Sequence, residues 1–160
     1  MLGRDRQLAR PRAHLAVSLC LAALQYARTR RLLPAIACLV SGFLVDADHL
    51  LDHQLYHRAP AGRADWARRR LVLALHGWEL LIPVLVLESL VLRGRAATAH
   101  GLTLGYLVHL LIDQFSNQLE HPLAYSLLYR ASRRFQGPFF TPNDARAWRR
   151  ESVLRLWRWL

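Results

Sequence analysis

The chain has 160 residues, 53% of them apolar, and its 22 basic residues, all arginine, outnumber 11 acidic ones for a net charge of +11. This length favours one domain, and the apolar content with only 21% charged residues suits an ordinary globular protein. The charge suits either nucleic acid or an anionic membrane surface. Long apolar runs favour the membrane, so membrane lipids are the expected partners and nucleic acid is not. The rival, a soluble basic helical protein that binds nucleic acid, requires these runs to form a water-soluble core.

The first apolar run, residues 13–27, follows four arginines in the first 12 residues. That layout also fits a secretory signal peptide, but we interpret the run as a retained helix because its His14 belongs with polar residues of later runs. The run is short for a full membrane span. Cys20 and Cys38 lie in the first two runs without CxxC spacing, which predicts small buried side chains and no disulfide.

The second run begins at Leu32 and leads into residues 42–57, GFLVDADHLLDHQLYH, where three carboxylates and three imidazoles alternate. Asp46 and His49 share a helix stripe, whereas Asp48 falls on nearly the opposite side. One ion can therefore use both aspartates only if the helix ends or distorts here. Carboxylate oxygens and imidazole nitrogens are ligands that zinc, manganese and iron accept. The alternative interpretation is a solvated loop of mixed charge.

The third run, residues 71–92, is long enough to cross a hydrocarbon core of about 30 Å as a helix. It carries His76 and Glu79, which are three positions apart and so neighbours on a helix surface. Glu88 lies toward the far end of the run, and we interpret it as a structural or snorkelling group.

The fourth run, residues 96–115, carries His109 and Asp113 on one helix face, with Tyr106 on the same stripe. Each imidazole with its neighbouring carboxylate can offer a metal ligand and a partner that orients it. His100 lies at the far end of this run, and we interpret it as a structural group.

Beyond the fourth run the sequence is amphipathic and basic. A Thr-Pro-Asn-Asp sequence at 141–144 predicts the start of a helix. The tryptophans and arginines that follow it favour a position at the level of the lipid headgroups. A loosely packed basic tail is the alternative. Strand signals are weak throughout. The sequence thus predicts an all-α fold with about four mainly transmembrane helices over residues 1–120, followed by a basic, Trp-rich interface tail with an amphipathic C-terminal helix over 121–160.

If the four runs cross a membrane alternately, one side receives His14, Asp46, His49, His76, Glu79, His109 and Asp113, whereas Glu88 and His100 lie at the far side. A random scatter would spread such residues evenly over both ends. Ionisable residues inside membrane helices are costly, so function is their default explanation. Each histidine alone is more often a hydrogen-bonded core residue. The expected ligands of one or two divalent ions, zinc first and manganese or iron as alternatives, are His14, Asp46, His49, His76, His109 and Asp113. Glu79 or Asp48 is the expected catalytic general base of a hydrolase.

Four segments together resemble the LexA-regulated type of small membrane-bound, metal-dependent hydrolases. They are AHLAVS with His14, VDADH with Asp46, Asp48 and His49, LALHGWELL with His76, and GYLVHLLID with His109 and Asp113. The resemblance covers residues 13–115 and implies hydrolysis, with a phosphoester such as an anionic phospholipid headgroup as the substrate. The alternative is a non-catalytic membrane protein with a structural metal site or a proton or ion path.

Arginine distribution predicts how the protein is oriented. With four crossings, 17 of the 22 arginines lie on the side of the polar cluster and 5 on the other. Positively charged loops stay cytoplasmic, so we expect an integral protein of the inner or plasma membrane whose site and termini face the cytoplasm. The arginines between residues 58 and 70 also suit an anionic headgroup, although the topology signal alone explains them.

Overall fold

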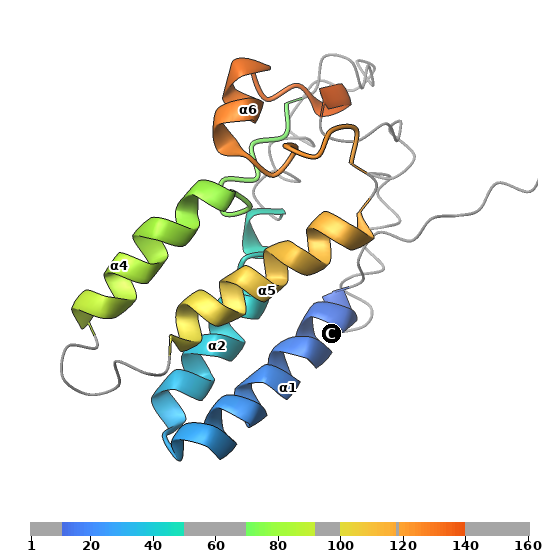
Figure 1. Ribbon diagram of the computed structural model, residues 1–160. Helices are drawn as coiled ribbons and strands as arrows, with labels where there is room; N and C mark the ends of the chain where they lie inside the picture. Colours follow the sequence, from blue (N-terminus) through green and yellow to red (C-terminus); the bar gives the residue numbers. More distant parts are fainter. Residues whose placement is uncertain (1–10, 50–69, 92–99, 118, 140–160) are drawn as a thin grey trace, which may run out of the picture.

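A computed structural model describes residues 11–49, 70–91, 100–117 and 119–139 of the chain. Within these ranges the only regular secondary structure besides a single β-bridge is helical, which confirms the all-α class. The bounds are α1 Pro11–Thr29, α2 Leu32–Leu44, α4 Leu81–Val91, α5 Gly101–Ser116 and the short α6 Leu127–Ser132. The four longer helices form a bundle with α6 beyond one end (Figure 1). The C-terminal helix predicted after residue 140 lies outside the described ranges.

A tight connection makes α1 and α2 antiparallel neighbours. Arg30 has a left-handed φ of 55°, and its N–H donates to the carbonyl of Tyr26 at 2.7 Å, which ends α1. Because α2 begins two residues later, the start of α1 and the end of α2 lie together. His14 and Asp46 therefore reach the same end of the bundle.

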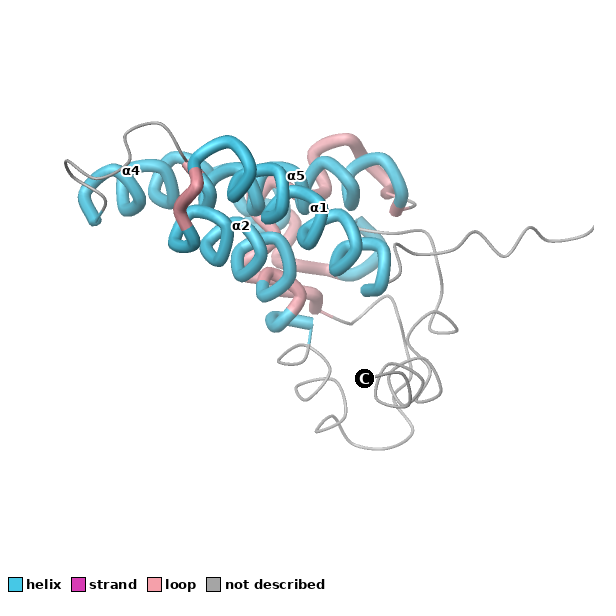
Figure 2. Tube along the Cα trace, turned by 90° about the horizontal axis from the view of Figure 1, so that it is seen from below, coloured by secondary structure: helices cyan, strands magenta, loops and turns pink. Residues whose placement is uncertain are grey.

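Small residues bring α2 and α5 into close backbone contact. A Cβ on Gly105 would collide with the carbonyl of Cys38, and one on Gly101 would collide with the carbonyl of Pro34. The pairing of these two helices is central, with α1 on one side and α4 on the other (Figure 2). This approach brings the backbone of α2 within hydrogen-bond distance of side chains on α5 and so helps to build the site.

The prediction of one continuous helix over residues 71–92 is wrong in its first part. Residues 71–77 are irregular, a 3₁₀ turn spans Trp78–Leu80, and α4 begins only at Leu81. Leu71 and Leu73 are buried while Val72 between them is exposed, a period of two that suits extended chain. An all-apolar run hides that alternation. His76 consequently lies on an irregular segment and shares no helix face with Glu79.

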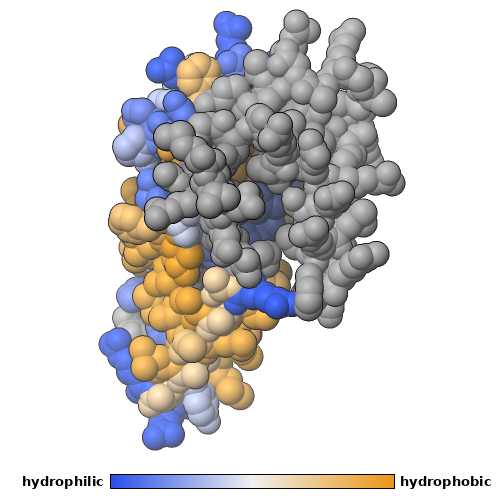
Figure 3. Space-filling view, turned by 90° about the vertical axis from the view of Figure 1, so that its right-hand side faces the viewer, coloured by the Kyte–Doolittle hydropathy of each residue, from blue (hydrophilic) through white to orange (hydrophobic). Residues whose placement is uncertain are grey.

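The sequence predicts four mainly transmembrane helices, but the structure supports only an all-α fold with one possible membrane span among the described residues. Among the described residues, one helical stretch, Leu32–His49, is long and apolar enough to cross a membrane. α4 has 11 residues and is only about 16 Å long. Large apolar side chains are nevertheless exposed along α1, α2 and α4, and Figure 3 shows such a surface on one face. Cys38 is buried as predicted, but Cys20 is exposed.

A cap formed by residues 119–139 packs on the irregular segment that carries His76. Its buried contacts join Ala124 and Tyr125 to Leu71 and Leu73. A single antiparallel bridge between Arg70 and Gln136 ties the start of the segment to the cap. The segment is therefore held by tertiary contacts where it lacks helical hydrogen bonds.

Candidate metal centre

Four side chains converge at one end of the bundle with one donor atom each. They are Asp46 from the end of α2, His76 from the irregular segment, and His109 and Asp113 from α5. His76 Nε2 lies 3.6 Å from Asp46 Oδ1 and 3.2 Å from Asp113 Oδ2. His109 Nε2 lies 3.5 and 3.4 Å from the same two oxygens. Donor atoms around a tetrahedral zinc at about 2.0–2.1 Å are about 3.3 Å apart, so the group has the size of a zinc site.

Hydrogen bonds fix the tautomers of the two central histidines. His109 Nδ1 lies 2.8 Å from the carbonyl of Gly42, which can only accept, so this nitrogen carries the proton. His76 Nδ1 lies 3.0 Å from Asp48 Oδ2 and donates in the same way. The neutral rings therefore turn two Nε2 lone pairs toward each other at 3.1 Å. Such lone pairs repel unless a proton or a metal ion lies between them.

Asp48 lies behind His76, on the side away from the other donors. Its Oδ2 also accepts from the backbone N–H of Leu75 at 2.8 Å. Helix α2 ends at Leu44, and a turn at residues 45–46 precedes a last helical turn at 47–49. This distortion lets Asp46 face Nε2 of the His76 ring while Asp48 faces Nδ1, which a regular helix would prevent. Asp48 thus has the geometry of a carboxylate that orients a metal ligand.

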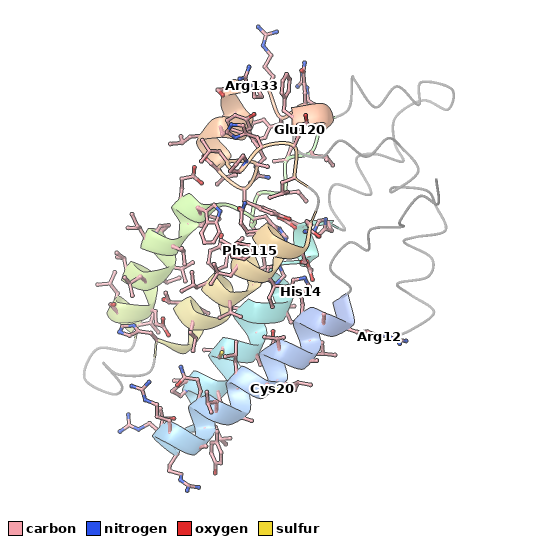
Figure 4. The ribbon with its side chains drawn as sticks, turned by 45° about the vertical axis from the view of Figure 1, so that its right-hand side comes forward. Arg12, His14, Cys20, Phe115, Glu120 and Arg133 are labelled. Atoms are coloured by element: carbon pink, nitrogen blue, oxygen red, sulfur yellow. The ribbon has the colours of Figure 1, made fainter. Side chains whose placement is uncertain are left out.

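His14 and His49 flank the four-atom group without belonging to it. His14 Nε2 lies 3.0 Å from Asp113 Oδ1, the oxygen that faces away from His76. The His14 ring lies against that of His109 at a tilt of 30°, with the ring centroids 4.2 Å apart. His14 lies near the N-terminal end of α1 (Figure 4). His49 Nε2 lies 3.7 Å from Asp46 Oδ1 and forms a second possible metal group with Asp48 and His76. The six predicted ligands are thus brought together, four around one point and two beside it.

Three buried polar atoms of this cluster have no hydrogen-bond partner among the described residues. They are His14 Nδ1, Asp46 Oδ2 and Asp48 Oδ1. Burying polar atoms without partners is costly, and native proteins rarely leave them so unless a ligand, ion or water satisfies them. Carboxylate oxygens in this state are acceptors, which a cation or a water molecule can satisfy. The residues present therefore fit a divalent metal.

Electrostatics at His76 support the same conclusion. Burial by itself would lower the pKa of this histidine, but its hydrogen bonds to Asp113, Asp46 and Asp48 raise it well above the usual 6.5. Three carboxylates around one imidazole hold a proton because their negative charge lacks compensation. A divalent ion at the four donor atoms would supply that positive charge.

Glu79, predicted as a general base, is placed differently. Its carboxylate accepts from the hydroxyl of Ser126 and from the backbone N–H groups of Leu127 and Leu128. Burial would raise its pKa, but these hydrogen bonds outweigh it and lower the pKa to about 2. A carboxylate with these bonds is a weak proton acceptor. Glu79 therefore caps the start of α6, and the structure gives no support to its predicted catalytic role.

Two positions to which the sequence assigned no role help to build the site. Gly42 supplies the carbonyl that orients His109, and Tyr106 holds the His76 segment through its hydroxyl, which lies 2.8 Å from the carbonyl of Leu75 and 2.7 Å from that of Gly77. The sequence contains a hint of the role of Tyr106, because this residue lies on the same stripe of α5 as His109. It contains no such hint for Gly42, since a backbone acceptor does not depend on residue type.

Comparison with known proteins gives no independent guide to function. Searches against family models, curated proteins and solved structures found no match to this chain. The resemblance to metal-dependent hydrolases therefore stays a prediction, and the geometry of the centre carries the functional argument.

Proposed function

We propose that this chain is a membrane-bound, metal-dependent hydrolase that acts on a phosphoester, with an anionic phospholipid headgroup as the substrate. The observation that carries the proposal is the pair of Nε2 atoms of His76 and His109, 3.1 Å apart and flanked by two carboxylates. Mixed nitrogen and oxygen donors suit zinc first, with manganese or iron as alternatives.

A divalent ion in such a site acts as a Lewis acid toward an ester oxygen and makes water acidic enough to ionise near neutral pH. Groups of the protein orient the side chains that would bind the metal. Asp48 and the carbonyl of Gly42 hold the two imidazoles in the tautomers that ligation requires. His14 fixes the outer oxygen of Asp113. These contacts preorganise the centre, which is the main contribution that a protein makes to metal catalysis.

Solvent access favours catalysis over a purely structural metal. The side chains of His76 and Asp113 are buried, but that of Asp46 is 23% exposed and that of His49 is 39% exposed. In this proposal, water and a small ester would approach from the side of Asp46 and His49. His49 is the imidazole placed there to accept a proton, since Asp48, the other predicted base, is buried behind His76.

A structural metal site is the second candidate, and one observation favours it. Four protein donors fill a tetrahedral zinc, whereas catalytic zinc sites keep a position open. Under this alternative the metal pins the end of α2, the His76 segment and α5 together, and the protein has no turnover.

The decisive experiment is metal analysis of detergent-purified protein, followed by hydrolysis assays. Bound zinc and hydrolysis of bis(p-nitrophenyl) phosphate that a chelator abolishes and zinc restores would support the hydrolase. Bound metal without turnover on this ester or on anionic phospholipid vesicles would favour the structural site. Absence of bound metal would refute both candidates. His109→Ala and Asp46→Ala should each lower metal content more than tenfold, while His100→Ala, at the far end of α5, should leave it unchanged.

Membrane attachment is supported by the Leu32–His49 stretch and by the exposed apolar side chains around it. The proposed orientation puts the site and both termini in the cytoplasm. Single cysteines at Gly62, Arg93 and Ser132, introduced after removal of Cys20 and Cys38, test it with a membrane-impermeant reagent in intact cells. We expect labelling at position 93 alone. Labelling at position 62 or 132 would contradict this topology.

A further inference from the structure

The proposed metal ligand His76 lies on an irregular segment, whose conformation depends on contacts with other parts of the protein. Residues 71–77 have no helical hydrogen-bond ladder, and Leu73 has a φ of 41°. A left-handed conformation is unfavourable for a residue with a side chain, and it persists only where surrounding contacts enforce it. The position of the His76 ring therefore depends on groups outside the segment.

Arg130 on α6 holds this segment from the side of the cap, while Tyr106 on α5 holds it at Leu75 and Gly77. The Arg130 side chain is buried, with the whole residue 3% exposed. Nη1 donates to the carbonyl of Val72 at 2.7 Å and to that of Leu73 at 3.1 Å, and Nη2 donates to the carbonyl of His76 itself. The planar guanidinium thus joins the strained turn to the ligand residue in one rigid fork, which lysine cannot reproduce.

Contacts at the start of α6 hold the Arg130 side chain in a fixed position. Glu79 accepts from the first two N–H groups of α6, and Ser126 accepts from the third, at Tyr129. Tyr125 stacks on the His76 ring with the ring centroids 5.9 Å apart. α6 is therefore anchored at its start and contributes Arg130 from its fourth residue.

We propose that Arg130 is a positioning residue for the metal centre, because it sets where His76 places Nε2. The inference rests on the proposed metal binding and adds that α6, which contributes no ligand to the four-atom group, controls the geometry of that group. Metal ligands must keep their distances within about 0.2 Å. Loss of the fork would let the segment relax and move His76 while the three ligands from α2 and α5 stay in place.

The test uses cobalt(II), whose visible absorption reports ligand geometry, added to the metal-free full-length protein in detergent. Arg130→Gln and Arg130→Lys should each weaken cobalt binding about 10- to 100-fold and reduce the tetrahedral absorption bands. Arg133→Gln is the matched control, because Arg133 is exposed beside α6 and contacts Tyr129 and Phe139. This control should match the wild type. Full recovery with lysine would show that only charge matters and would overturn the proposal.

A double-variant cycle separates positioning from general loss of fold. In a His76→Ala background, Arg130→Gln should weaken cobalt binding no further, because the ligand that Arg130 positions is already gone. An equal loss in both backgrounds would overturn the proposal in favour of simple destabilisation. Unchanged binding by Arg130→Gln, with a wild type that binds cobalt, would overturn the positioning role alone. A wild type without cobalt binding would overturn the metal centre as well.

Discussion

Replacing Asp48 with asparagine tests whether this carboxylate orients His76 or binds the metal itself. Asp48 accepts from Leu75 N–H at 2.8 Å and from His76 Nδ1–H at 3.0 Å. Both donors bond to the same oxygen, Oδ2, so the amide oxygen of asparagine can still accept from both, but the charge that strengthens these bonds is lost. One charge-assisted hydrogen bond is worth about 1.5–3 kcal/mol, which corresponds to about 10- to 150-fold in metal affinity. That range matches the loss known for groups that orient ligands.

The assay is competition for zinc between the detergent-solubilised protein and a fluorescent chelator. His109→Ala removes a direct ligand and should cost more affinity than Asp48→Asn, while His100→Ala should leave the affinity unchanged. An equal loss for Asp48→Asn and His109→Ala would show that Asp48 is a ligand, as in the group that it forms with His49 and His76. No loss for Asp48→Asn would refute the orienting role.

Two further predictions concern the scaffold. Gly105→Ala inserts a methyl group against the Cys38 carbonyl and should lower the free energy of unfolding of the metal-free protein by about 1–3 kcal/mol in denaturant titrations. The control Ala23→Leu, on the exposed face of α1, should not lower it. Equal stability of the two variants would contradict tight α2–α5 packing. Glu79→Gln should lower the melting temperature at pH 7, and the gap to wild type should close as pH falls from about 4.5 to about 2, because the lowered pKa makes Glu79 stabilising only while it is ionised. A gap that does not shrink between about pH 4.5 and about pH 2 would show that the charge of Glu79 is not what caps α6.

Sequence was a good guide to the elements with strong local signals. The run at 13–27 gave α1, and charged breaks separated it from α2. Convergence of the polar residues followed from antiparallel helices alone, since alternate crossings put the start of one run beside the end of the next. His14, Asp46, His109 and Asp113 could therefore be grouped before their distances were known.

Sequence was a poor guide where the chain leaves regular structure. Residues 71–77 are nearly all apolar, so neither a period of two nor a period of 3.6 was visible, and a helix was the default. From the sequence alone, Glu79 can be related only to His76, three positions away. Its actual partners begin at Ser126, 47 positions later. Arg130 likewise looks like any arginine of a basic tail until its three carbonyl acceptors are known.

Glu79 and Glu88 also constrain how long α4 can be. Glu79 holds the start of α6 at the metal end, while Glu88 accepts from the N–H groups of Leu102 and Thr103 at the start of α5. One inserted residue would shift one glutamate by about 1.5 Å and about 100° around the axis relative to the other, so it could not serve both helices. The length of α4 thus fixes the distance between the two glutamates at the two ends of the bundle. In homologous chains its outward apolar side chains should exchange freely, whereas the nine-residue spacing of the two glutamates should admit no insertion or deletion.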